Sequence, residues 1–128
     1  MSMEASVAPE ASGDAVLDLI ADFTAARPRW RPDTLRTAAL CLADAMGCAL
    51  AALDDPDCAR LMGPLFAGSP AGDVGVPGTG QWLDPVKAAF DIGTLVRWLD
   101  FSDTTFVGGH PSDNLGAILA AAAHAATL

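Results

Sequence analysis

A chain of 128 residues, 52% of them hydrophobic, is long enough for one folded domain and too apolar to be disordered throughout. Its net charge of −9, from 16 acidic and 7 basic residues, disfavours binding to nucleic-acid phosphates and to anionic membrane surfaces. Alanine is abundant and tyrosine is absent, which favours closely packed helices over sheets.

The amino-terminal residues 1–12 carry acidic side chains where a secretory signal needs a basic region, and no apolar core follows directly. We therefore expect a flexible leader over these residues and a cytoplasmic protein. The most apolar stretches are interrupted by Asp44 and His124, so neither is expected to offer the roughly 20 residues that a membrane span requires.

Apolar residues at helical spacing predict helices in the first half of the chain. The first follows a cap at Ser12 or Asp14 and ends at the prolines of "ARPRWRP". A shorter helix is expected from Cys58 to about Phe66. Between these two, a long helix is predicted over residues 32–53, with an apolar stripe formed by Leu35, Ala39, Leu42, Met46, Ala49 and Leu53.

The segment "GSPAGDVGVPGTG", residues 68–80, has the glycine and proline content of a connection built from turns. It leaves room for only a very short strand around Val74 and Val76. No full strand precedes "GTG" and no Gly-Lys-Ser/Thr follows it, so turn chemistry explains the glycines better than a phosphate-binding loop does.

Two further helices are predicted after this connection. Asp84 and Pro85 supply a cap and a first-turn proline, and the helix that they begin should run to about Leu99. Its core-facing residues are expected to be Val86, Ala89, Phe90, Leu95 and Trp98. The last helix should begin near Pro111 and continue to the final residue. The predicted fold class is therefore all-α, with about four to five helices.

The three cysteines form no Cys-x-x-Cys pair. Cys41 and Cys48 lie on the same predicted helix, where about 10 Å of rise separates them, too far for a disulfide. Reduced and mostly buried thiols are therefore expected.

Polar chemistry is concentrated in "LDFSDTTFVGGHPSDNLGAIL", residues 99–119, between two apolar helices. Asp100 and Thr104 are four residues apart, and the Gly108-Gly109 pair lets the chain fold back just before His110. A carboxylate, a hydroxyl and an imidazole from one segment can thus meet at one point. Imidazole titrates near neutral pH, so it can act as a base and then as an acid.

The residues that follow His110 read as a helix entrance, where Ser112, Asp113 and Asn114 are capping and first-turn residues whose backbone N–H groups favour an anion. Arg97 could hold a substrate carboxylate or pair with a neighbouring acid.

A purely structural role fits the same pattern, with Asp100, Asp103 and Ser112 capping helix ends and His110 closing the loop through a hydrogen bond to backbone. Asp100, Asp103, His110 and Asp113 could supply metal ligands, but no recognised metal-ligand spacing is present, so no metal is expected. His124 is expected to be a packed or partly exposed histidine rather than a ligand.

Residues 88–123, with "RWLDF" and "HPSDNLGAIL", resemble the MmgE/PrpD family. "VPGTG" and "LADAMGCALAAL" extend the resemblance to about residues 14–128. The resemblance implies that Asp100, Thr104 and His110 are catalytic. From the helix entrance and the guanidinium described above, Ser112, Asp113, Asn114 and Arg97 are expected to bind substrate. It also implies a large helical domain with a smaller α+β domain, dimers, and chemistry that needs no cofactor.

The branch that the chain resembles most eliminates water from 2-methylcitrate to give 2-methyl-cis-aconitate in propionate breakdown, and other branches decarboxylate cis-aconitate or epimerise iminodisuccinate. The chain resembles about the first quarter of a member, without the smaller domain or the downstream histidine and lysines. We therefore expect it to be inactive or incomplete alone. The alternative is a non-catalytic helical fragment that associates with itself or a partner through an unfinished apolar face.

Overall fold

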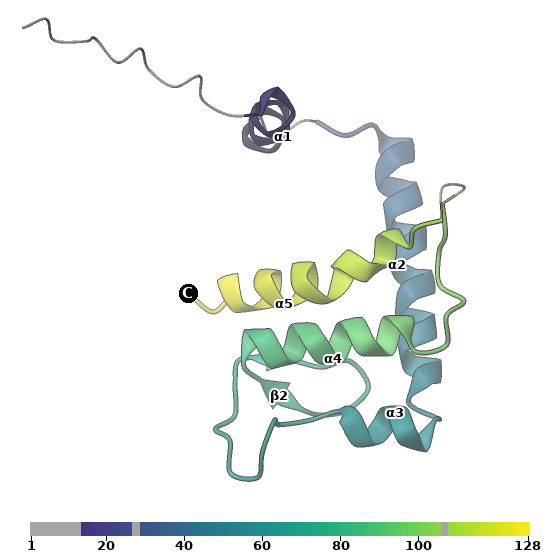
Figure 1. The fold of residues 1–128 in the computed structure, drawn as a ribbon, viewed down its shortest axis with the longest axis vertical. Helices are drawn as coiled ribbons and strands as arrows, with labels where there is room; N and C mark the ends of the chain where they lie inside the picture. The colour runs from purple at the N-terminus through teal and green to yellow at the C-terminus, as the bar shows by residue number, and fades with distance from the viewer. Residues whose placement is uncertain (1–13, 27–28, 106–107) are drawn as a thin grey trace, which may run out of the picture. The chain divides into compact units, whose positions relative to one another are not determined.

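The structure, a computed structural model, describes residues 14–26, 29–105 and 108–128. The chain divides into two compact units, residues 1–34 and 35–128. Within the described residues, five α-helices, one 3-10 turn and a ribbon of two very short strands make up the secondary structure (Figure 1). The predicted all-α class is confirmed, whereas the expected leader over residues 1–12 lies outside the described residues.

The first unit contains α1 (Ala15–Ala25). Asp14 caps this helix by accepting a hydrogen bond from the backbone N–H of Val16 at 2.9 Å. It is one of the two residues, Ser12 and Asp14, that were predicted as alternative caps. The rings of Phe23 and Trp30 lie edge to face with their centroids 5.8 Å apart. No residue of α1 is buried, so the helix leaves its apolar side chains exposed.

The long helix α2 (Pro32–Ala52) enters the core through its carboxyl-terminal half. Its buried residues are Ala45, Cys48, Ala49 and Ala52. The predicted stripe is therefore only partly right, because Leu35 and Leu42 are exposed while the small residues face the core. A face of small side chains allows neighbouring segments to approach the helix backbone closely.

The expectation that no stretch is long enough for a membrane span is wrong for α2. This helix has 21 residues and a window of mean hydropathy 1.4, which meets the requirement by length and composition despite Asp44. It is the only such helix among the described residues. Core helices of soluble proteins meet the same criterion, and four residues of α2 lie in the core.

The short helix α3 (Pro56–Leu61) begins earlier than predicted and ends before Phe66. Asp55 sets its start, because its carboxylate accepts a hydrogen bond from the backbone N–H of Asp57 at 2.8 Å. The helix ends at Met62, whose backbone is extended, and Gly63 follows with φ of 108°, a conformation that glycine adopts without strain.

A small ribbon lies beside the helices. Strand β1 (Val74–Gly75) is the one predicted from the valines, and it pairs antiparallel with β2 (Trp82–Leu83), which was not predicted. Gly72 makes this ribbon possible, because a Cβ at that position would lie 1.9 Å from the backbone oxygen of Leu83.

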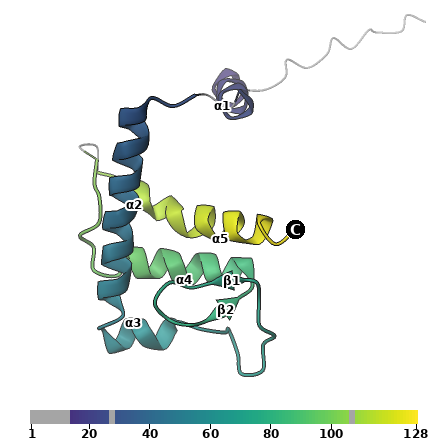
Figure 2. The same ribbon diagram turned by 180° about the vertical axis from the view of Figure 1, so that it is seen from behind.

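Helices α4 (Pro85–Arg97) and α5 (Leu115–Ala125) lie side by side and antiparallel in both views (Figures 1 and 2). Gly116 allows this approach, because a Cβ there would lie 2.4 Å from the backbone oxygen of Ala89. The apolar residues that α4 buries are Ala88, Ile92, Leu95 and Val96. Of the predicted core residues Leu95 is buried, whereas Val86 and Phe90 are exposed because the opposite face of α4 meets α5 and the ribbon.

The core also holds a buried ion pair, in which the fully buried Asp91 binds the ammonium of Lys87. The second carboxylate oxygen of Asp91 accepts a hydrogen bond from the backbone N–H of Gly63 at 2.9 Å. Lys87 donates a further hydrogen bond to the backbone oxygen of Leu61 at 3.1 Å. The pair thereby fastens the end of α3 to α4.

The predicted last helix consists of two parts and ends early. The 3-10 turn η1 (Pro111–Asn114) precedes α5, which ends at Ala125 rather than at Leu128. His124 lies 2.6 Å through Nδ1 from a carboxylate oxygen of Asp73, and the hydroxyl of Thr127 donates to the same oxygen at 2.9 Å. These contacts join the end of α5 to the segment before β1.

Candidate active site

The loop from α4 to η1 begins with an unusual backbone conformation at Asp100. This residue has φ of 55°, the only non-glycine residue with positive φ among those described. Its backbone N–H donates to the oxygen of Arg97 at 3.0 Å, which closes the end of the helix. A non-glycine residue held in this region is strained by about 1–3 kcal/mol, and such residues concentrate at functional sites.

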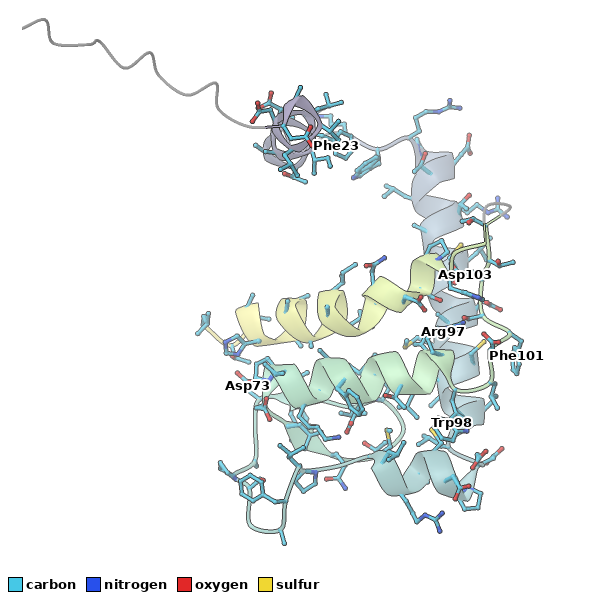
Figure 3. All side chains as sticks on the ribbon, in the orientation of Figure 1. Phe23, Asp73, Arg97, Trp98, Phe101 and Asp103 are labelled. Carbon is cyan, nitrogen blue, oxygen red and sulfur yellow. The ribbon has the colours of Figure 1, made fainter. Side chains whose placement is uncertain are left out.

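Arg97, the last residue of α4, binds two carboxylates at once. Its Nη2 lies 2.8 Å from an oxygen of Asp100, and its Nε lies 2.9 Å from an oxygen of Asp113. The remaining nitrogen, Nη1, is buried and has no partner within the described residues. Of the two roles left open by sequence, pairing with neighbouring acids is therefore the one seen. Figure 3 labels Arg97 at this end of α4.

His110 belongs to the same group of charged residues. Its Nε2 lies 3.9 Å from the Asp100 oxygen that also contacts Arg97, a distance too long for a hydrogen bond. Its Nδ1 is buried without a partner among residues 14–26, 29–105 and 108–128, and the side chain is 24% exposed. A histidine with one nitrogen beside a carboxylate and the other unpaired can accept a proton.

Thr104 is not joined to this group by any hydrogen bond within the described residues. Its side chain is exposed and donates to the backbone oxygen of Thr105 at 3.3 Å. Thr105 instead closes the turn at the glycine pair, because its hydroxyl accepts from the N–H of Gly109 at 3.2 Å. Gly108 has φ of 83°, as a sharp turn at this pair requires.

The three residues predicted at the helix entrance bind different partners and do not converge on one point. Ser112 is buried; its N–H donates to the carboxylate of Asp103 at 3.2 Å, and its hydroxyl donates to that of Ser102 at 3.2 Å. Asp113 binds Arg97 as described above. Asn114 is exposed and donates to the backbone oxygen of Pro111 at 3.3 Å.

Ser102 and Thr105, which shape the loop, were not predicted from the sequence, and Asp103 was considered as a helix cap or a metal ligand. His110, not Asp103, occupies the cap position of η1, so spacing alone does not predict the bond between Asp103 and the N–H of Ser112. Nothing in the spacing indicates that Ser102 meets Ser112, because the two hydroxyls come together only through the fold of the intervening loop.

One cavity adjoins the candidate site, and another lies at the amino-terminal end of α4. The first, of about 290 Å³, is lined by Ala38, Cys41, Leu42, Pro111, Ser112 and Leu115, and is called here the α2 cavity. The second, of about 310 Å³, is lined by Leu65, Asp84, Val86, Lys87 and Phe90. Only the α2 cavity contains residues of the candidate site.

The described residues contain no group of three or more His, Cys, Asp or Glu side chains that could hold a metal ion. Cys48 and Cys58 are buried with free thiols. Burial is the largest of the causes that raise the pKa of each thiol. Cys41 is also a free thiol, but it is exposed, so the expectation of buried thiols holds for two of the three.

Residues 18–127 match the sequence model of the MmgE/PrpD N-terminal domain. The chain belongs to the MmgE/PrpD family. It is 57% identical over 90 residues to 2-methylcitrate dehydratase of Escherichia coli K12, an alignment that covers 67% of this chain and 18% of that relative. The family resemblance expected from the motifs is thereby confirmed.

Other members of the MmgE/PrpD family match in the same way. The 2-methylcitrate dehydratase of Cupriavidus necator is 56% identical over 67% of this chain and 18% of its own length. A probable 2-methylcitrate dehydratase of Saccharomyces cerevisiae is 44% identical over 90% of this chain and 23% of its own length. The chain thus spans about a fifth of the length of the relatives that it matches.

Proposed function

We propose that this chain forms the amino-terminal part of a hydro-lyase that removes water from 2-methylcitrate, with His110 as its proton-transferring residue. The observation that carries the proposal is the position of His110, whose Nε2 faces Asp100 at 3.9 Å while its Nδ1 has no partner in the described part of the chain. The similarity to relatives named 2-methylcitrate dehydratase supports this choice of reaction.

In the proposed step, the imidazole of His110 removes a proton from the carbon next to a substrate carboxylate. The electron pair of that C–H bond becomes the new carbon–carbon double bond, and the C–O bond of the neighbouring hydroxyl breaks. The hydroxyl takes up a proton from solvent as the C–O bond breaks and leaves as water, and the protonated His110 then returns its proton to solvent. Asp100 would orient the imidazole and stabilise its protonated form, while Thr104 would hydrogen-bond a substrate oxygen.

The charges of the site and of the substrate indicate that substrate binding needs more cationic side chains than this segment supplies. A tricarboxylate carries three negative charges, whereas Arg97 is already shared between Asp100 and Asp113. Additional cations must therefore come from the remaining length of a full member, as the resemblance implies. For residues 1–128 alone we expect little or no turnover.

The test is His110→Gln in a full-length family member with the same residues in this segment, numbered as here. Formation of the conjugated double bond from 2-methylcitrate is followed by ultraviolet absorbance. The value of kcat should fall by about 10²-fold or more, because general acid–base catalysis contributes at least that much.

The matched control is His124→Gln, which removes the other histidine of the chain, also paired with an aspartate but at the opposite end of α5. This variant should keep kcat within a few-fold of the unmodified enzyme. Near-normal turnover of the His110→Gln variant would remove His110 from the mechanism.

A further inference from the structure

The α2 cavity is linked to the candidate site because residues that line the cavity are neighbours of His110 in the sequence. Pro111 and Ser112, which line it, directly follow His110. The position of this wall is fixed by two hydrogen bonds of Ser112, a partly buried one to Asp103 and a buried one to Ser102. The opposite wall is one face of α2, since Ala38, Cys41 and Leu42 are three and four residues apart on the helix.

The lining of the α2 cavity selects against charge. No Asp, Glu, Lys, Arg or His side chain lines it, and its one hydroxyl, that of Ser112, already donates to Ser102. A carboxylate placed there would lose its hydration without gaining a partner, which is costly. An aliphatic group placed there would instead leave water for contact with Leu42 and Leu115.

We propose that the α2 cavity is the subsite for the alkyl substituent of the substrate, and that it selects 2-methylcitrate over citrate. The inference rests on the proposed function. It assigns Ala38, Leu42 and Leu115 as specificity-determining residues, with the substrate carboxylates outside the cavity. A volume of about 290 Å³ is ample for a methyl group, and a larger side chain in the lining should take up part of the space next to that group.

The experiment compares Ala38→Leu with the matched control Ala43→Leu in a full-length family member with the same residues in this segment. Both substitutions enlarge an exposed alanine of α2, but Ala43 lies about 140° around the helix from Ala38 and does not line the cavity. Leucine has a high helix propensity, so neither change should disturb α2.

The value of kcat/KM is measured for 2-methylcitrate and for citrate. Ala38→Leu should lower the ratio of the two values by about 10-fold or more, the discrimination that one methyl-sized group provides in an apolar pocket. Ala43→Leu should leave the ratio unchanged. Equal ratios in both variants would overturn the subsite while leaving the His110 test unaffected. An unmodified enzyme inactive on both substrates would overturn the proposed function and the subsite with it.

Alkylation of Cys41 gives a second readout that needs no turnover. Cys41 lines the cavity and is exposed, whereas Cys48 and Cys58 are buried and should react slowly with iodoacetamide. In the same full-length protein, 2-methylcitrate should slow the alkylation of Cys41 more than equimolar citrate does. Identical rates with the two ligands would contradict the proposal.

Discussion

Two carboxylate–cation pairs in this chain differ chiefly in exposure. The pair of Lys87 and Asp91 is buried, with side chains 11% and 0% exposed, whereas the side chains of Arg60 and Asp57 are 75% and 69% exposed. Water solvates the second pair and screens it, so its contribution to stability is small. The first pair lies in the core, where a charge without its partner is strongly destabilising.

At the residue scale, Asp91→Ala should therefore lower the free energy of unfolding by about 3–5 kcal/mol, because it leaves the Lys87 ammonium buried and unpaired. Asp57→Ala, which removes the exposed carboxylate, should cost about 1 kcal/mol or less. Urea unfolding of the two variants beside the unmodified chain provides the measurement. Similar losses in both variants would show that the pair of Lys87 and Asp91 is solvated.

At the scale of elements, the short distance between α4 and α5 is possible because Gly116 has no side chain. Gly116 faces the backbone of α4, and its hypothetical Cβ would lie 2.8 Å from the nitrogen of Gly93 as well as close to Ala89. Because η1 continues into α5, this contact also positions the turn that follows His110. Gly116, the glycine of "HPSDNLG", is therefore needed for the close packing of α4 and α5, whether or not it has any role in catalysis.

Gly116→Ala should destabilise the chain by about 1–3 kcal/mol, since the two helix backbones must separate. Gly47→Ala is the matched control, because Gly47 lies within α2, is exposed, and has no atom within 4 Å of the added Cβ. That variant should gain about 0.5–1 kcal/mol from helix propensity. Thermal unfolding followed by circular dichroism compares them, and a stabilised Gly116→Ala would contradict the close approach of α4 and α5.

At the scale of the whole molecule, two hydrogen-bonded carboxylates connect segments far apart in sequence. The carboxylate of Asp73 is hydrogen-bonded by His124, and that of Asp55 accepts from the indole of Trp98 at 2.9 Å. The hydrogen bond with His124 is the main cause that lowers the pKa of Asp73, and the hydrogen bond from the Trp98 indole is the main cause that lowers the pKa of Asp55. Protonation of either carboxyl group weakens its contact.

The sign of the pH dependence follows from these lowered pKa values. The stability that Asp55 and Asp73 contribute is complete above the unfolded-state pKa of about 4, and it is lost as pH falls through the folded-state values. The urea midpoint should therefore drop between pH 5 and pH 2. The double variant Asp55→Asn and Asp73→Asn should start lower at pH 7 and lose less on acidification. An unchanged acid dependence in the double variant would contradict this account.

Several features of the fold follow from the sequence alone because their causes are local. Asp14 and Asp84 cap helices through hydrogen bonds to backbone N–H groups two or three residues ahead. The prolines of the described residues stand either at the first position of a helix or outside the helices. The motif "HPSDNLG" and the polar loop before it also identified the family and placed the candidate site between the last two helices. All of these are properties of short stretches of chain.

The tertiary structure alone decided which faces are buried and which partners the site residues have. Periodicity placed Phe90 in the core, but packing against α5 and the ribbon buries Ile92 and leaves Phe90 exposed. Spacing left Arg97 between substrate and neighbouring acid, and its contact with Asp113 exists only because η1 returns to the end of α4. Such contacts join residues distant in sequence, so their geometry depends on the packing of whole helices and no local pattern encodes it.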